Sequence, residues 1–339
     1  MADADQAAGP GGGDERAERT RAMYSRVRYP GLDPDANARY VRHRRFVYAR
    51  MGLDCDTFLR DRTVLDAGCG TGEETLFLAS LGPARVVGID TSAGSLEVAR
   101  ASAARAGLGN VEFRLASVLE ATHFADGSFD YVSSLGCIHH TPDMPRAFDN
   151  LCRWTAPGGL LATFVYNPYG HFVYNLQCNA LDLIAGQDPD ARVRWARRLF
   201  DWRRDKTFYR EGVAAAYDGR LYDKYGVLYR ECLSLSVLLR WYRTRGVEPF
   251  GAFPMYARDM VDALMAREGM RTPPTDRRGR LAWRLHRLLP TPGPRQWTWR
   301  RRTLMQLLLL GLGCVDYGSA FRVVGRKAGG TADAAGWGR

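Results

Sequence analysis

Apolar and polar positions follow two different rhythms between residues 63 and 166. Short runs of consecutive apolar residues, typical of strands buried on both faces, occur at 63–67, 85–89, 111–115, 129–134 and 160–166. Stretches with helical spacing separate them, at 73–81, 92–107 and 143–154. Strands that alternate with helices in this way predict parallel strands joined by right-handed crossovers. The pattern therefore predicts a doubly wound, mostly parallel α/β sheet whose site lies at the carboxyl ends of its strands.

A glycine-rich loop follows the first predicted strand. It reads Asp66-Ala67-Gly68-Cys69-Gly70-Thr71-Gly72, and a helical pattern begins directly after it. Glycines at alternate positions let bare backbone approach a ligand where a Cβ atom would clash. The second strand ends in Asp90, where nucleotide-binding α/β folds hold ribose hydroxyls with a carboxylate. Because Asp66 would repel a pyrophosphate, a cationic ligand without phosphate suits this loop better than a dinucleotide.

The pattern Asp66-x-Gly68-x-Gly70-x-Gly72 with Asp90 resembles the first motif of the class I S-adenosyl-L-methionine (SAM)-dependent methyltransferases. This resemblance implies a seven-stranded Rossmann-like sheet and SAM as the cofactor, with S-adenosyl-L-homocysteine as the product. It implies that Asp66 acts near the methionine amino group and that Asp90 takes the ribose hydroxyls. The loop residues Cys69 and Thr71 would contribute backbone N–H groups.

The resemblance extends to the next strand ends. Thr91 follows Asp90, and Ser117 and Val118 stand where the family meets the adenine. The family often has an acidic residue at the position of Ser117, so this chain departs from the pattern there, although a hydroxyl can still accept one hydrogen bond. Leu135 and Gly136 would line the methionine moiety.

Two adjacent histidines follow the fourth strand. The segment from Leu135 to Asp143, with His139-His140-Thr141-Pro142 inside it, resembles the start of the active-site loop in many small-molecule methyltransferases. A hydroxyl or ammonium acceptor must lose a proton, and histidine is suited to remove it near neutral pH. His139 and His140 are therefore candidate bases, with His171 as a third. The alternative that a histidine only caps a helix or holds the loop stays open.

The organisation of the chain follows from shifts in composition. Residues 1–20 read as a flexible tail and 21–58 as N-terminal helices, among them one at 36–51, that act as a lid or pack on the sheet edge. The SAM-binding core is predicted at 59–167, and a largely helical substrate cap at 168–245. Residues 246–327 complete the core with strands at 246–250 and 320–326. They enclose a basic helical insertion, 251–315, with a helix at 303–312, and 328–339 read as a second tail.

Composition limits the classes of protein. A hydrophobic content of 46% is ordinary for a globular chain, and no apolar run is long enough to span a membrane. The start lacks the pattern of a signal peptide, which predicts a cytoplasmic protein. The seven cysteines show neither zinc nor disulfide spacing, so no metal is expected. The net charge of +11 includes nine arginines within 276–302, a stretch that could bind an anionic partner or RNA.

These observations favour a SAM-dependent methyltransferase that acts on an O or N atom, less readily a C atom, of a small-molecule acceptor, in bacterial specialised metabolism. An aromatic group at Tyr166, Tyr169, Phe172 and Tyr174 could enclose that acceptor or simply form core. Two alternatives remain: an RNA or protein methyltransferase that uses 276–302, and a SAM-fold protein that catalyses another reaction. No RNA-binding module is recognisable in the sequence, which makes nucleic acid an unlikely partner.

Overall fold

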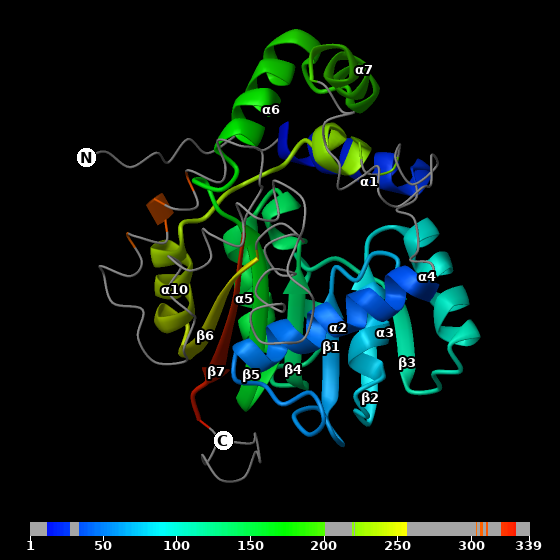
Figure 1. Ribbon diagram of the computed structural model, residues 1–339, viewed down its shortest axis with the longest axis vertical. Helices are drawn as coiled ribbons and strands as arrows, with labels where there is room; N and C mark the ends of the chain where they lie inside the picture. The colour runs from blue at the N-terminus through cyan, green and yellow to red at the C-terminus, as the bar shows by residue number, and fades with distance from the viewer. Residues whose placement is uncertain are drawn as a thin grey trace, which may run out of the picture.

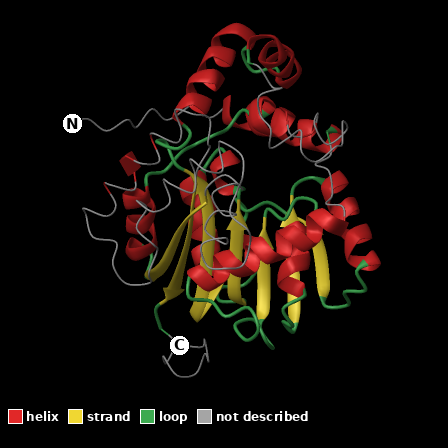
Figure 2. Ribbon diagram, in the orientation of Figure 1, coloured by secondary structure: helices red, strands yellow, loops and turns green. Residues whose placement is uncertain are grey.

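The protein forms a seven-stranded sheet in the order β3-β2-β1-β4-β5-β7-β6 (Figures 1 and 2). This computed structural model describes residues 12–27, 34–200, 219, 221–255, 303, 306–307, 310 and 320–329. The strands are β1 (Thr63–Ala67), β2 (Arg85–Asp90), β3 (Val111–Leu115), β4 (Phe129–Leu135), β5 (Thr155–Tyr166), β6 (Val247–Met255) and β7 (Ala320–Lys327). Only β7 runs antiparallel to both of its neighbours, while β1 to β5 are parallel. The predicted doubly wound, mostly parallel sheet is confirmed.

Two of the strands are longer than their apolar runs. The sequence predicts a strand at 160–166, but β5 already begins at Thr155, which pairs with Phe129 of β4 across an irregularity in the register. Gly158 lies inside the strand with a φ of 77°, a conformation that glycine adopts without strain. Strand β6 extends from the predicted 246–250 to Met255, because it pairs with β7 along its whole length.

Helices cover both faces of the sheet. On one face lie α2 (Pro34–Arg50), α3 (Glu73–Ala79) and α4 (Ala93–Arg105). The Tyr48 ring of α2 lies 5.5 Å from Phe77 of α3 and 6.4 Å from Tyr131 of β4. On the other face, α5 (Met144–Trp154) and α10 (Leu235–Thr244) meet through Phe148 and Tyr242, whose rings are 5.1 Å apart. The main core is thus sandwiched between two helical layers.

A separate helical layer lies above the carboxyl ends of the strands (Figure 1). It contains α1 (Gly12–Arg26), α6 (Phe172–Ala185), α7 (Pro189–Leu199) and the one-turn helix η4 (Tyr222–Gly226). The short helices η1 (Ala121–His123) and η2 (Ile138–His140) belong to loops of the sheet. Within this layer, α6, α7 and the residues at η4 share a small core of their own, formed by Tyr174, Cys178, Leu181, Val193, Ala196, Leu221 and Tyr225. We refer to this layer as the cap.

The structure differs from the predicted domain boundaries at two places. Residues 12–20, predicted as tail, form the first turns of α1, whose Met23 is buried. The predicted cap extends to residue 245, but α10 buries Leu235, Leu238 and Leu239 in the main core and therefore belongs to the sheet layer.

The basic stretch 276–302 and most of the insertion at 251–315, including most of the helix predicted at 303–312, lie outside the described residues. None of the described helices is long and apolar enough to cross a membrane.

Candidate active site

The glycine loop connects β1 to α3 in a conformation that glycine alone adopts readily. Gly68, Gly70 and Gly72 have φ values of 82°, 53° and 90°. A Cβ atom on Gly68 would lie 2.3 Å from Cys137 Cβ, and one on Gly72 would lie 2.9 Å from Ala99 Cβ. These two glycines therefore allow close packing within the protein. A Cβ atom on Gly70 would meet nothing within 4 Å, so the loop is open at this position, as a ligand site requires.

Asp90, at the end of β2, is held in place by the backbone. Its Oδ2 accepts a hydrogen bond from the Gly70 N–H at 2.9 Å, and its Oδ1 accepts one from the Ser92 N–H at 2.8 Å. Burial raises the pKa of this carboxyl, while the backbone donors act in the opposite direction. Each oxygen keeps a further lone pair. The carboxylate is therefore oriented beside the open position of the loop and can accept two hydroxyl groups.

Asp66 is 1% exposed and lies beneath the loop. The Thr75 hydroxyl of α3 donates a hydrogen bond to its Oδ2 at 2.6 Å. Burial, followed by the nearby charge of Glu74, raises the pKa of Asp66 to about 7. A neighbouring cation would restore its ionised form. The chemistry of this position thus suits a positively charged ligand.

A buried polar cluster behind Asp66 has no signal in the sequence. Glu74 accepts hydrogen bonds from Tyr48 at 2.6 Å and Tyr40 at 2.7 Å, both on α2. Arg44 Nε lies 2.8 Å from Glu74 Oε2, and Arg322 Nη2 of β7 lies 3.5 Å from Oε1. Burial alone would raise the pKa of Glu74, but the two guanidinium groups outweigh it, so the pKa is lowered. This cluster anchors α2 and β7 to the start of α3.

One predicted loop contact is wrong. The Cys69 N–H donates to the Ile89 carbonyl at 2.9 Å and is therefore not available to a ligand. Its side chain is 7% exposed and packs in a second small core with Leu96, Ala99 and Phe113. The Thr71 hydroxyl bonds the Glu73 carboxylate at 2.8 Å. Because the loop closes back on β2 before it reaches α3, the backbone N–H of Cys69 is used within the fold, and any other contact of Cys69 with the cofactor stays a prediction.

The other predicted cofactor positions line the same edge of the sheet. Thr91 is exposed beside Asp90, and Leu135 and Gly136 are half-buried after β4. Ser117 is half-buried, and its hydroxyl accepts a hydrogen bond from the Leu119 N–H at 3.2 Å. Val118 is 5% exposed and packs in the main core. The order of the strands places these residues along the sheet edge that carries the glycine loop. Their contacts with the cofactor stay a prediction.

The three candidate histidines converge on one tyrosine ring. Tyr166, at the end of β5, has its ring centroid 4.0 Å from His139, 5.3 Å from His140 and 4.1 Å from His171. The last pair is stacked, with an interplanar angle of 17°. Strands β4 and β5 are neighbours, and His171 is the residue before α6. We refer to these four residues as the histidine cluster.

His140 has the best-defined protonation state in this cluster. Its Nδ1 lies 2.7 Å from the Tyr229 carbonyl oxygen. Since a carbonyl only accepts hydrogen bonds, Nδ1 carries the proton and Nε2 keeps its lone pair. Burial lowers the pKa of His140, so the ring is neutral at pH 7. A neutral, oriented imidazole with a lone pair on Nε2 has the form of a general base.

The other two histidines are more enclosed. His139 is completely buried, and within the described part of the chain neither ring nitrogen has a hydrogen-bond partner. Burial lowers the pKa of His139 well below its usual range. His171 is 9% exposed, with Nδ1 3.3 Å from the Asn167 carbonyl oxygen. Among the described residues, no three His, Cys, Asp or Glu side chains are placed to hold a metal ion.

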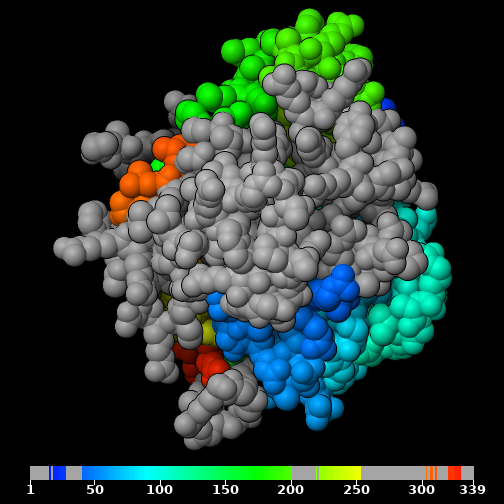
Figure 3. Space-filling view, viewed as in Figure 1, coloured from blue at the N-terminus to red at the C-terminus, as the bar shows by residue number. Residues whose placement is uncertain are grey.

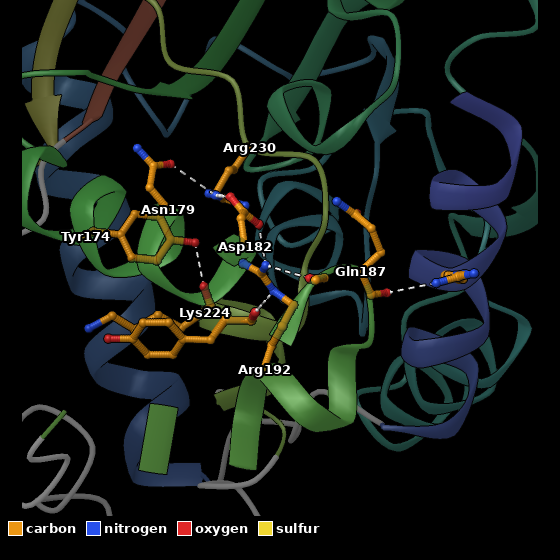
Figure 4. Close-up of polar contacts among 10 residues, drawn as sticks. Tyr174, Asn179, Asp182, Gln187, Arg192, Lys224 and Arg230 are labelled. Atoms are coloured by element: carbon orange, nitrogen blue, oxygen red, sulfur yellow. Dashed lines mark hydrogen bonds and ion pairs between the residues drawn. The ribbon is translucent and has the colours of Figure 1, made fainter. Parts of the chain in front are cut away.

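A polar network in the cap supports residues 225–230, which include Tyr229, the residue whose carbonyl contacts His140 (Figure 4). Asp182 of α6 pairs with two arginines: with Arg192, which is fully buried on α7, and with Arg230, next to Tyr229. The Tyr225 carbonyl accepts a hydrogen bond from Arg192 Nε at 2.8 Å. The residue-by-residue pattern of the sequence does not show this network, because its members lie far apart along the chain.

The residues that follow this segment in the chain form hydrogen bonds with the backbone after β4 and at the end of β5. The Glu231 N–H donates to the His139 carbonyl at 2.9 Å, and the Leu233 N–H donates to the Tyr166 carbonyl at 2.9 Å. Helix α1 adds a link on the other side of the site. Its Tyr24 carbonyl accepts from the Ser92 hydroxyl at 3.3 Å, and the Tyr24 hydroxyl donates to Asp223 at 2.8 Å. The cap is therefore joined to both the Asp90 loop and the histidine cluster.

Comparison with known proteins gives a match for the central part of the chain. A family described as "Methyltransferase domain" matches residues 64–159. An uncharacterized protein of Synechococcus sp. is 37% identical over 126 residues, covering 37% of this chain and 30% of that protein. Trans-aconitate 2-methyltransferase of Deinococcus radiodurans is 39% identical over 114 residues, covering 33% and 41%.

A third relative extends the match slightly further. Methyltransferase GfsG of Streptomyces halstedii is 33% identical over 157 residues, covering 44% of this chain and 54% of that protein. The matches span between 30% and 54% of these three relatives. The residues matched by the family, 64–159, contain the glycine loop, Asp90 and the two adjacent histidines. Residues 64–159 therefore form a class I SAM-dependent methyltransferase domain.

Proposed function

We propose that the protein transfers a methyl group from SAM to an oxygen or nitrogen atom of a small-molecule acceptor. The observation that carries this proposal is the histidine cluster after β4, the strand that pairs with β1 ahead of the glycine loop, with His140 held as a neutral imidazole. Bound SAM supplies a methyl group already activated by its sulfonium. The residues of the chain then need to bind and align the acceptor and remove one proton.

The residues around the loop fit SAM. The two free lone pairs of the Asp90 carboxylate suit the ribose hydroxyls, and the open backbone at Gly70 leaves room beside them. Asp66, with its raised pKa, suits the positive methionine end. A relative named as a methyltransferase of a small molecule, Trans-aconitate 2-methyltransferase, is similar to this chain over 114 residues. These features support SAM as the methyl donor.

The base that we assign is His140, through Nε2. The Tyr229 carbonyl holds Nδ1–H and so directs the lone pair of Nε2 away from that contact. The Tyr166 ring stacks on His171 and meets the His140 ring edge-on at 5.3 Å, and His139 is buried beside Tyr166. Such a set of planar rings favours a flat or apolar acceptor over a highly charged one. A phenol or an enol has a flat shape and an acidic proton. An aromatic amine is also flat, and after methylation it is an ammonium ion that gives its proton to the base.

Assays for S-adenosyl-L-homocysteine would test this proposal directly. We expect SAM and S-adenosyl-L-homocysteine both to bind in calorimetry, and a panel of phenols, enols and amines to contain acceptors that release the product. Binding of SAM without product from any acceptor would instead favour a SAM-fold protein with another reaction. Turnover that requires RNA or a protein, with binding that weakens steeply with salt, would favour the macromolecular alternative.

A first prediction concerns the pH dependence of SAM affinity. The pKa of Asp66 is about 7 in the free protein, and a methionine ammonium beside it would favour the carboxylate. SAM binding should therefore release protons near pH 7, and affinity should rise as the pH passes upward through 7 and then level off. Calorimetry in two buffers of different ionisation enthalpy measures this release. An Asp66→Asn variant should bind weakly with no such rise, and a wild-type affinity independent of pH would contradict the assignment.

A second prediction concerns Arg230, which we assign as a positioning residue for His140. Its pair with Asp182 holds the neighbouring Tyr229 carbonyl, and its charge lowers the pKa of His140. Arg230→Gln should lower kcat by roughly tenfold and raise the pKa of His140. The acidic limb of the kcat–pH profile should then move to higher pH, with the Kd for SAM unchanged.

Matched variants separate positioning from a general structural effect. Arg230→Lys keeps the charge and should leave the acidic limb of the profile in place. Arg153→Gln removes an exposed arginine that pairs with Asp126 at the opposite end of the sheet, and it should change neither kcat nor the profile. An Arg230→Gln variant with the wild-type profile would show that Arg230 does not act on His140.

A further inference from the structure

Helix α6 is apolar on two opposite sides, and among the described residues only one of these sides packs in a core. The inner side lies in the cap core through three buried residues, Tyr174, Cys178 and Leu181. On the outer side, Phe172 is 44% exposed, Leu176 54% and Leu183 89%. Residues at spacings of four and seven share one face of a helix. A solvent-facing helix side ordinarily carries polar residues, so this apolar stripe calls for a partner.

The exposed side of α6 also lacks charge. The only charged residue among its 14 positions is Asp182, whose carboxylate is already paired with Arg192 and Arg230. An acidic or basic protein partner would therefore find no complementary group on this helix. Among the exposed residues of α6, Asn179 adds an uncharged amide, and the rest of this side offers apolar contact.

The neighbouring helix α7 supplies positive charge and a tryptophan. Arg194, Arg197 and Arg198 are all exposed on it. The Arg198 guanidinium lies 5.4 Å from the centroid of the Trp195 ring, and Trp195 itself is 37% exposed. Leu199, at the end of the helix, is 49% exposed. Two acidic residues lie at the start of α7: Asp188, 3.9 Å from Arg194, and Asp190, which pairs with Arg26 of α1. The rest of the exposed side of α7 is apolar and basic.

The two helices form one end of the molecule. Figure 1, with the longest axis vertical, places α6 and α7 together at the top, and Figure 3 shows the same end as a rounded projection. Exposed leucines, a tryptophan and arginines at one end of a molecule are the pattern of elements that lie in the interface of an anionic bilayer. Helices of 14 and 11 residues are too short to span it. They can, however, lie in its plane.

We propose that the α6–α7 hairpin docks the protein on an anionic lipid surface. The apolar stripe of α6 enters the boundary between headgroups and acyl chains, and the arginines of α7 contact the lipid phosphates. A second copy of the chain is a weaker occupant, because the outer arginines of two hairpins would repel each other and a rounded end offers little flat area for a stable dimer. This inference is independent of the acceptor and of methyl transfer.

Vesicle binding by the full chain tests the proposal. We expect the protein to co-sediment with vesicles of equimolar phosphatidylcholine and phosphatidylglycerol at low salt, and much less with phosphatidylcholine alone. The double variant Leu176→Ser/Leu183→Ser should lower the partition coefficient about tenfold or more, because two leucines no longer enter the lipid. The triple variant Arg194→Gln/Arg197→Gln/Arg198→Gln should lose the preference for phosphatidylglycerol.

A matched control and a second measurement make the outcome decisive. Leu115→Ser removes a leucine of similar exposure, 61%, at the end of β3, and should bind vesicles as the wild type does. Because all of these side chains are exposed, the Tm should stay unchanged in every variant. Vesicle binding that is absent in the wild type, or equal in wild type and double variant, would overturn the proposal. A dimer in analytical ultracentrifugation that the double variant dissociates, without vesicle binding, would assign the surface to a second copy instead.

Discussion

Replacing His140 with alanine is expected to lower kcat by roughly 10²–10⁴-fold, the usual contribution of a positioned general base. The Kd for SAM should stay within about a factor of two of the wild-type value, because His140 lies after β4 and is not among the groups that face the ribose or the loop. Product release measured at saturating acceptor gives kcat, and calorimetry gives the affinity. The physical reason is the loss of the Nε2 lone pair that the Tyr229 carbonyl orients.

The pH profile provides a second test of His140. Burial lowers its pKa below the ordinary value of 6.5, so the wild-type base stays active below that pH and fails only as the pH falls through the lowered pKa. The alanine variant should lack this acidic limb. His43→Ala, on the half-exposed part of α2, serves as the control and should behave as the wild type. A His140→Ala enzyme with wild-type rates at every pH would remove His140 from the mechanism and turn attention to His171.

Replacing Asp90 with alanine should weaken SAM binding by roughly 10²–10⁴-fold, because two hydrogen bonds to a charged acceptor contribute about 1.5–3 kcal/mol each. The change also leaves the Gly70 and Ser92 N–H groups without their acceptor, which loosens the glycine loop. Calorimetry with S-adenosyl-L-homocysteine should show the same loss, since both ligands carry the ribose.

Asp90→Asn refines this test. The amide keeps one acceptor oxygen and should give an affinity between the wild type and the alanine variant. Asp126→Ala removes an exposed carboxylate far from the loop and should leave the affinity unchanged. If the Asp90→Ala protein keeps its Tm and binds SAM as the wild type does, then Asp90 does not contact the ribose.

Local sequence determined the sheet and the ligand loop. Each buried strand of a parallel sheet needs a short apolar run, so β1 and β3 occupy the predicted 63–67 and 111–115. The three glycines could be identified as loop residues because their positive φ values depend on the residue itself and on nothing distant. The position of Asp90 follows from chain direction alone, because the carboxyl ends of neighbouring parallel strands lie at the same edge of the sheet. These features needed no knowledge of the cap.

Only the tertiary structure decided which side chains meet across long separations. The glycine spacing suggested that Cys69 presents its N–H to a ligand, yet the turn back onto β2 gives that N–H to Ile89. The Tyr229 carbonyl fixes the tautomer of His140, and Glu74 pairs with one arginine from α2 and one from β7. Such contacts depend on how whole elements pack, and pairs of residues far apart in the chain leave no local pattern. The sequence predicted a largely helical segment at 168–245, while packing alone determined which of the two apolar sides of α6 remained exposed.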